Sequence, residues 1–181
     1  ATTTGVETTN STYGTNATIG GDLTVAGSVF SGGTPTLGGL TVTAKATSGT
    51  VTYVAGININ PFTGGAQQIT TLPAATVGVV CIHAQSVDTT GGTAFLSFDC
   101  AGSDAYETGS VIESRTSSAV TFDTSTAGET LLKFTPANAA TNLMSIGSYI
   151  YFTCTTAGLW NVSYNFQHLG AGTTGTFVFA A

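Results

Sequence analysis

His83 and His168 are the two side chains of this sequence that ordinarily act as a base near neutral pH. Nucleophilic catalysis needs a nucleophile, a base and a third group that orients the base. The sequence contains neither a Gly-x-Ser-x-Gly elbow nor a Cys-His signature. We therefore predict a chain that has no catalytic residues and is not an enzyme.

Cys81 and His83 stand two residues apart on a predicted strand, so their side chains would point to the same face. Together with Cys100 or His168 they would supply the sulfur and nitrogen ligands that zinc prefers. A single Cys-x-His pair on a strand does not define such a site. A hydrogen-bonded His beside a small apolar Cys is the favoured interpretation, and we predict no metal site.

Three acidic residues, Asp99, Asp104 and Glu107, stand close together around a glycine. Carboxylate oxygens on such a loop are possible calcium ligands, but the spacing is not that of an EF-hand. A solvated acidic loop is favoured over a calcium site. No cofactor is predicted, because no glycine pair is followed by the helix start that a phosphate-binding loop requires.

The three cysteines are Cys81, Cys100 and Cys154, and an odd number is not a disulfide framework. Cys100 and Cys154 each alternate with large apolar residues of a predicted strand, so both share a face with core residues. Buried, reduced thiols are therefore predicted, which is consistent with folding in a cytoplasm.

Charged residues make up only 7% of the 181 residues, against about a quarter in ordinary soluble domains. Thr is the commonest residue and there are 24 Gly, a composition typical of strands joined by turns. A surface made largely of neutral polar side chains suits a subunit that is packed against neighbours. The alternative is a secreted domain with a neutral polar coat.

The net charge of −6, with only Lys45, Arg115 and Lys133 as basic residues, excludes a nucleic-acid or anionic-membrane surface as the expected partner. No apolar run approaches the length that spans a bilayer.

From residue 51 onward, short apolar-alternating segments are bounded by clusters of Gly, Pro, Asn and Ser, which predicts an all-β domain. The predicted strands are Val51–Asn60, Gln67–Leu72, Val77–Gln85, Thr93–Cys100, Ala119–Asp123, Thr130–Thr135, Ser148–Thr155, Leu159–Gln167 and Thr176–Ala180.

Alternation within these strands predicts their buried faces. In Leu159–Gln167, the residues Trp160, Val162, Tyr164 and Phe166 should face the core. In the preceding strand Ile150 and Phe152 should point inward, which leaves Tyr149 and Tyr151 on the outside. The predicted fold is an antiparallel β-sandwich or jelly-roll-like head over residues 51–181, with an extended N-terminal arm.

Residues 1–50 form that predicted arm, which is rich in Thr and Gly and poor in large apolar side chains at its start. A short repeat runs through it: residues 18–27 resemble residues 36–44, and each unit is a turn followed by a short strand. Each unit exposes an apolar stripe that is too narrow to bury itself, and three chains side by side could bury three such stripes. The predicted contacts with other subunits are Ile19, Leu23, Val25, Leu37, Leu40, Val42, Tyr149 and Tyr151.

Two sets of sequence segments resemble known structural proteins of viruses. Residues 18–27, TIGGDLTVAG, resemble the Gly-Gly-Asp-Leu-Thr-Val turns common in tail-fibre and other structural proteins of tailed phages. Residues 69–80, 148–154 and 158–162 together are similar to a recurrent viral structural domain, in which a Leu-Pro-Ala-Ala strand precedes a final hairpin with Gly and Trp. The resemblance implies a capsid decoration or cement subunit, or a fibre module, without catalytic residues.

The function we expect is that of a structural component of a virion, most simply a capsid decoration subunit that stabilises the shell through its arm and strand edges. The expected partners are copies of the same chain, as a trimer, and major capsid or other virion proteins. The expected localisation is the virus particle. The arm would gain order only on docking and so act as a clamp.

Two other functions are compatible with the sequence. A receptor-binding or carbohydrate-binding fibre tip would need exposed aromatic side chains at a loop end, and Tyr106, Tyr149 and Tyr151 are the set available. A subunit of a cellular surface filament would have the same composition as a virion protein.

Overall fold

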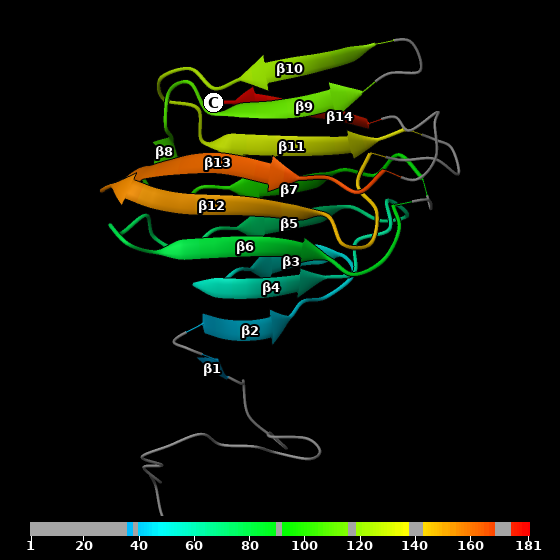
Figure 1. The fold of residues 1–181 in the computed structure, drawn as a ribbon, viewed down its shortest axis with the longest axis horizontal. Coiled ribbons are helices and arrows are strands. Elements are labelled where there is room, and N and C mark those ends of the chain that lie inside the picture. Colours follow the sequence, from blue (N-terminus) through cyan, green and yellow to red (C-terminus); the bar gives the residue numbers. More distant parts are fainter. Residues whose placement is uncertain (1–35, 38–39, 90–91, 116–118, 138–142, 169–174) are drawn as a thin grey trace, which may run out of the picture. The chain divides into compact units, whose positions relative to one another are not determined.

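The computed structural model describes residues 36–37, 40–89, 92–115, 119–137, 143–168 and 175–181. These residues form fourteen strands and no helix. The strands make two sheets, here called sheet I and sheet II, which lie one over the other as the two layers of a sandwich (Figure 1). The prediction of an all-β sandwich is therefore confirmed.

Each sheet has seven strands among the described residues. In spatial order, sheet I contains β1 (Thr36–Leu37), β2 (Leu40–Ala44), β4 (Gly56–Asn60), β6 (Val80–Gln85), β12 (Tyr149–Thr156), β13 (Leu159–Asn165) and β8 (Ala105–Tyr106). Sheet II contains β10 (Val120–Thr124), β9 (Val111–Arg115), β14 (Gly175–Ala180), β11 (Leu131–Pro136), β7 (Leu96–Asp99), β5 (Gln68–Thr71) and β3 (Gly49–Thr52).

The prediction of purely antiparallel pairing is wrong for the first half of the domain. From β2 to β7 the chain passes from one sheet to the other at every step, so β2, β4 and β6 are parallel in sheet I, and β3, β5 and β7 are parallel in sheet II. Parallel neighbours need a crossover connection. Here the strand in the opposite sheet serves as part of that crossover.

The second half of the domain is mainly antiparallel. β12 pairs with β6 on one side and with β13 on the other, and β11 lies between β7 and β14. Antiparallel strands can follow one another through a tight turn, and Gly158, with a φ of +80°, lies in the turn between β12 and β13. The domain thus joins a parallel two-sheet winding to an antiparallel sandwich, which is not a jelly-roll topology.

The core lies between the inner faces of the two sheets. Phe98 on β7 and Phe152 on β12 come from opposite sheets, and their ring centroids are 5.1 Å apart. Trp160 is fully buried, and Val162 and Phe166 are buried on the same face, as the alternation predicted. Tyr164 is partly buried and stacks on Phe166 with ring centroids 4.7 Å apart.

Several predicted boundaries differ from the structure. The single strand predicted over residues 51–60 is two strands, β3 and β4, which lie in different sheets. β9 was not predicted, because its sequence, VIESR, carries only two apolar residues. Cys81 and Cys154 are buried free thiols as predicted, whereas Cys100, just after β7, is only half-buried.

The segment 1–50 contributes strands to both sheets. β2 pairs in parallel with β4, and β3 begins at Gly49 and pairs with β5. β1 and β2 form a short hairpin in which Leu37 is opposite Leu40. The first unit of the repeat, with Ile19, Leu23 and Val25, lies outside the described residues.

Gly56 makes the break between β3 and β4 possible. It has a φ of +106°, which L side chains rarely adopt, and a Cβ atom at this position would collide with the carbonyl oxygen of Thr41 on β2. The parallel ladder between β2 and β4 therefore requires glycine at residue 56.

Replacing Gly56 with Ala should lower the free energy of unfolding by about 2–4 kcal/mol, because backbone strain and a clash with β2 add together. Gly78 is the matched control, since its φ is +87° and a Cβ there would meet nothing within 4 Å. Gly78→Ala should cost only about 1 kcal/mol. Denaturant unfolding measures both variants, and equal losses would contradict the role given to the contact with Thr41.

Candidate assembly surface

His83, the first candidate base, lies in a buried hydrogen-bond network between the sheets. Its Nδ1 atom is 2.7 Å from the hydroxyl of Tyr53, and its Nε2 atom is 3.1 Å from Oε1 of Gln85. Gln85 in turn donates from Nε2 to the carbonyl oxygens of Phe62 and Val87. All the side chains of this network are shielded from solvent.

The direction of these bonds fixes the proton on His83. Gln85 donates from Nε2 to two carbonyl oxygens, and its Oε1 atom can only accept, so Nε2 of His83 carries the proton and donates it to Gln85. Nδ1 of the neutral ring therefore accepts from the Tyr53 hydroxyl, which in turn accepts from Nδ2 of Asn60 at 2.6 Å. Burial lowers the pKa of His83 to about 3, because the charged imidazolium is disfavoured away from water. With both nitrogens occupied, His83 acts as a structural link between segments.

Cys81 shares the inner face with His83, as the spacing predicted, but its surroundings are not those of a metal ligand. Asn58 lies with its Nδ2 atom 3.5 Å from the Cys81 sulfur. Burial raises the pKa of this thiol to about 12, which opposes the thiolate that zinc requires. Within the described ranges no three His, Cys, Asp or Glu side chains are grouped so as to hold a metal ion.

The acidic segment 99–107 is more ordered than the predicted solvated loop. Asp104 accepts a hydrogen bond from the backbone N–H of Ala75 at 2.7 Å, and Ala105–Tyr106 forms β8, which pairs with β13. Tyr106 is buried and donates its hydroxyl proton to the carbonyl oxygen of Phe98. The predicted set of three exposed tyrosines is therefore wrong at Tyr106.

The outer face of sheet I is the surface on which predicted contact residues meet. Strand register aligns one row of side chains across β2, β4, β6 and β12, and a second row next to it. We call these two rows the apolar face. The first row is Val42, Ile57, Ile82 and Tyr151, and the second is Ala44, Ile59, Ala84 and Tyr149.

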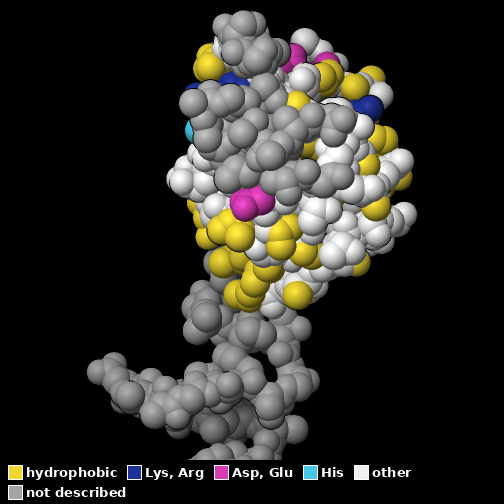
Figure 2. All heavy atoms as spheres, turned by 90° about the vertical axis from the view of Figure 1, so that its right-hand side faces the viewer, with side chains coloured by type: hydrophobic (Ala, Val, Ile, Leu, Met, Phe, Trp, Pro, Cys, Tyr) yellow, Lys and Arg dark blue, Asp and Glu magenta, His cyan; other side chains and the backbone are white. Residues whose placement is uncertain are grey.

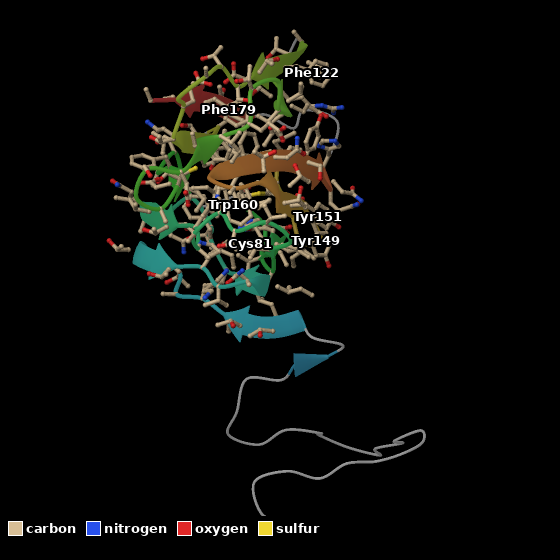
Figure 3. All side chains as sticks on the ribbon, turned by 90° about the vertical axis from the view of Figure 1, so that its left-hand side faces the viewer. Cys81, Phe122, Tyr149, Tyr151, Trp160 and Phe179 are labelled. Atoms are coloured by element: carbon tan, nitrogen blue, oxygen red, sulfur yellow. The ribbon has the colours of Figure 1, made fainter. Side chains whose placement is uncertain are left out.

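The apolar face contains no charged residue and no hydrogen-bonding side chain other than its two tyrosines. Tyr149 and Tyr151 stack with ring centroids 6.1 Å apart and planes 25° apart. Figure 3 shows both tyrosines on the outer side of the sandwich, whereas Cys81 and Trp160 lie between the layers. Ala84 is buried, and the other side chains of the face remain partly exposed or exposed.

The outer face of sheet II has a different composition. Its corresponding rows mix threonine, serine and charged side chains with single apolar residues, as is usual for a sheet face in contact with water. These rows are Thr50, Ile69, Ser97 and Lys133, and Thr52, Thr71, Asp99 and Leu131. The apolar face of sheet I is therefore the unusual one, and it ends at β13, where Ser163 and Asn165 are paired with Tyr151 and Tyr149.

Three of the eight predicted contact residues, Val42, Tyr149 and Tyr151, lie together on the apolar face. Leu37 and Leu40 are placed only by their backbone pairing in the β1–β2 hairpin, next to the same sheet. Figure 2 shows hydrophobic side chains gathered toward the end of the domain that carries β2, with few charged side chains nearby.

Sequence reasoning missed Ile57, Ile59 and Ile82 as surface residues. In β4 the isoleucines alternate with Asn58 and Asn60, and the structure buries the asparagines and turns the isoleucines outward. The alternation itself was visible in the sequence. Which of the two faces is buried was not visible, because apolar residues on a strand are ordinarily assigned to the core.

The His83 network predicts a pH-dependent stability. The ordinary pKa of His is 6.5 and the folded value is about 3, so between these pH values the unfolded chain takes up a proton that the folded chain does not. The contribution of neutral His83 to the free energy of unfolding is therefore fully present above pH 6.5. It is lost as the pH falls from 6.5 toward 3, at roughly 1.4 kcal/mol per pH unit.

Denaturant unfolding at a series of pH values below neutrality measures this slope. His83→Gln should reduce this slope by the share that one proton contributes, because glutamine does not titrate. An equal slope in wild type and His83→Gln would contradict the buried neutral state of His83.

The described residues include no helix long and apolar enough to cross a lipid bilayer. Comparison of the chain with protein-family models, with curated proteins and with solved structures finds no match.

Proposed function

We propose that the chain is a non-enzymatic structural subunit of a virus or phage particle, and specifically a capsid decoration or cement subunit. The observation that carries this proposal is the apolar face of sheet I. The rest of the surface has ample threonine and serine, yet this part of sheet I carries no charged residue. An apolar surface of this kind, which the single chain leaves exposed to water, indicates a contact with another protein.

The apolar face is the centre of the proposed interface. Its rows cross four strands, from β2 to β12, or three spacings of about 4.8 Å, and the two rows are two residues, about 7 Å, apart along the strands. Ser163 and Asn165 of β13, which are paired with Tyr151 and Tyr149, would lie at its polar rim.

Copies of the same chain are the partners proposed for this face. A face with no charge offers nothing to select a charged partner, whereas stacked tyrosines and isoleucines on one copy match those on another. In a trimer, three such faces would surround the axis.

The remaining features support a location in the virion. The low content of charged residues suits a subunit that is covered by neighbours. The resemblance of residues 18–27, 69–80, 148–154 and 158–162 to phage and viral structural proteins points the same way. Major capsid or other virion proteins are the further partners proposed, with the N-terminal segment as the clamp. Contacts of this kind depend little on ionic strength.

A fibre-tip role in carbohydrate or receptor binding has less support. Tyr106 is buried, and Tyr149 and Tyr151 are the first and third residues of β12, on the outer face of a sheet. The two tyrosines belong to a flat row with isoleucines, which suits protein contact better than a sugar-binding pocket.

Ile82→Glu should break the contact made through the apolar face and shift the assembled species to a smaller one, because it places an unpaired carboxylate in the centre of that face. We expect association to weaken by about two orders of magnitude or more. Sedimentation velocity measures the species. The matched control is Ile69→Glu, which makes the same change on a parallel strand on the outer face of sheet II.

The control should sediment like wild type. A monomeric wild type, or equal dissociation by the two variants, would contradict assembly through the apolar face. Circular dichroism of each variant establishes that the fold is retained.

The location in the particle is tested by immunogold labelling of purified virions with an antibody to the chain. We expect regular labelling of the particle surface. A chain lacking residues 1–33 keeps every described strand and should be incorporated at least tenfold less, since the proposed clamp is removed. Unlabelled particles would contradict the virion role, and unchanged incorporation would contradict the clamp alone.

A further inference from the structure

The β9–β10 hairpin is fixed to the domain by side chains that occupy the edge of β14. The Ser114 hydroxyl accepts a hydrogen bond from the N–H of Phe177 at 2.7 Å and lies 3.1 Å from the carbonyl oxygen of the same residue. Asp123 accepts a hydrogen bond from the N–H of Phe179 at 2.6 Å. One face of the hairpin is thus committed to the core side.

The opposite face of the hairpin is apolar and exposed. Strand register places Phe122 beside Glu113, Val120 beside Arg115, and Thr124 beside Val111. Phe122 is 60% exposed and Val120 is 46% exposed. Glu113 and Arg115 form an ion pair at 2.9 Å, so the charges of this face are already paired on β9.

β10 is also the last strand of sheet II, with β9 as its one neighbour among the described strands (Figure 1). Natural edge strands are usually blunted by lysine, proline, a bulge or a covering loop. β10, with the sequence VTFDT, has no lysine and no proline, and its register with β9 has no bulge. Its one charged side chain, Asp123, points to the core side, where it accepts the hydrogen bond from Phe179. Its composition is that of a paired strand.

We propose that β10 pairs in antiparallel fashion with β10 of a second copy of this chain, across a twofold axis beside Phe122. In this register Phe122 is opposite the partner subunit's Phe122, and Val120 is opposite the partner subunit's Thr124. All five residues of each strand are paired, so the outward backbone groups of both edges are satisfied. The two sheets II become one continuous sheet.

The charged side chains are compatible with this register. Along the row through the axis the order is Glu113, Phe122, the partner's Phe122 and the partner's Glu113, so the two glutamates are three strand spacings, or about 14 Å, apart. On the other face the two Asp123 carboxylates come about 8 Å apart, and each accepts a hydrogen bond from the N–H of Phe179 of its own subunit, which offsets their repulsion. On the exposed face the two Phe122 side chains are central, and Glu113 and Arg115 lie at the rim.

This contact does not rest on the proposed virion function. It uses the edge of sheet II, whereas the assembly surface of the proposed function is the outer face of sheet I. Its partner is a second copy because the twofold register pairs all five residues of each strand and places the exposed Phe122 against the partner subunit's Phe122.

Single cysteines test both the pairing and its register. Opposed residues of an antiparallel pair have Cβ atoms about 5 Å apart, which is close to disulfide reach, so Phe122→Cys should form a covalent dimer under mild oxidation. Val120 is the matched control. In the proposed register it is four residues out of step with the partner subunit's Val120, or about 14 Å away.

Phe122→Cys should yield at least tenfold more covalent dimer than Val120→Cys, and the wild-type chain, with its native thiols, should yield none. Equal cross-linking of the two variants, or no cross-linking of Phe122→Cys, would overturn the proposal. Because phenylalanine itself contributes to the contact, sedimentation of Phe122→Glu provides a second readout. It should abolish the edge contact, while Val77→Glu, at a side chain that is also 60% exposed, should not.

The same cross-link in an Ile82→Glu background separates this inference from the proposed function. A Phe122→Cys dimer that persists when the apolar face is disabled supports edge pairing by itself. Loss of the cross-link in that background would show that the edges meet only through the other interface, and would overturn the independent contact.

Discussion

The burial of the inner face of sheet I against sheet II is the interaction on which the domain depends. Phe98, Phe152 and Trp160 are all buried between the layers, and residues of both sheets belong to one core. Because the chain changes sheet at every strand from β2 to β7, neither sheet can be completed before the other. The two layers must therefore form together, and the turns that permit the exchange, such as the one at Gly56, are as necessary as the core itself.

The polar interior and the apolar exterior of the first half are consequences of the same alternation. Parallel register places Asn58 beside His83 and Asn60 beside Gln85 on the inner face of sheet I, where their side chains take part in hydrogen bonds inside the core. Buried polar groups are tolerated only with such partners. Once they point inward, Ile57, Ile59 and Ile82 must point outward, so the buried network and the proposed assembly surface imply each other.

The two surfaces proposed for association share a physical character. The apolar face of sheet I uses side-chain packing, and the β10 edge uses backbone hydrogen bonds around Phe122; neither depends on ion pairs between subunits. A chain with 7% charged residues has few other means of recognising a partner. The surface elsewhere, as on the outer face of sheet II, is mainly polar, so association is limited to these two surfaces.

Composition and alternation alone determined that the chain is all-β, that Trp160 and Phe152 face a core, and that Tyr149 and Tyr151 face outward, because these depend on the two-residue period of a strand. Which sheet a strand joins, and whether its neighbour is parallel, depends on residues far apart in the chain, so the sandwich was predicted without its parallel half. For the same reason the tyrosines were identified but not the isoleucines that complete their rows. Only the tertiary structure decided that the asparagines of β4 find partners inside, since a lone strand cannot show which of its faces will meet complementary polar groups.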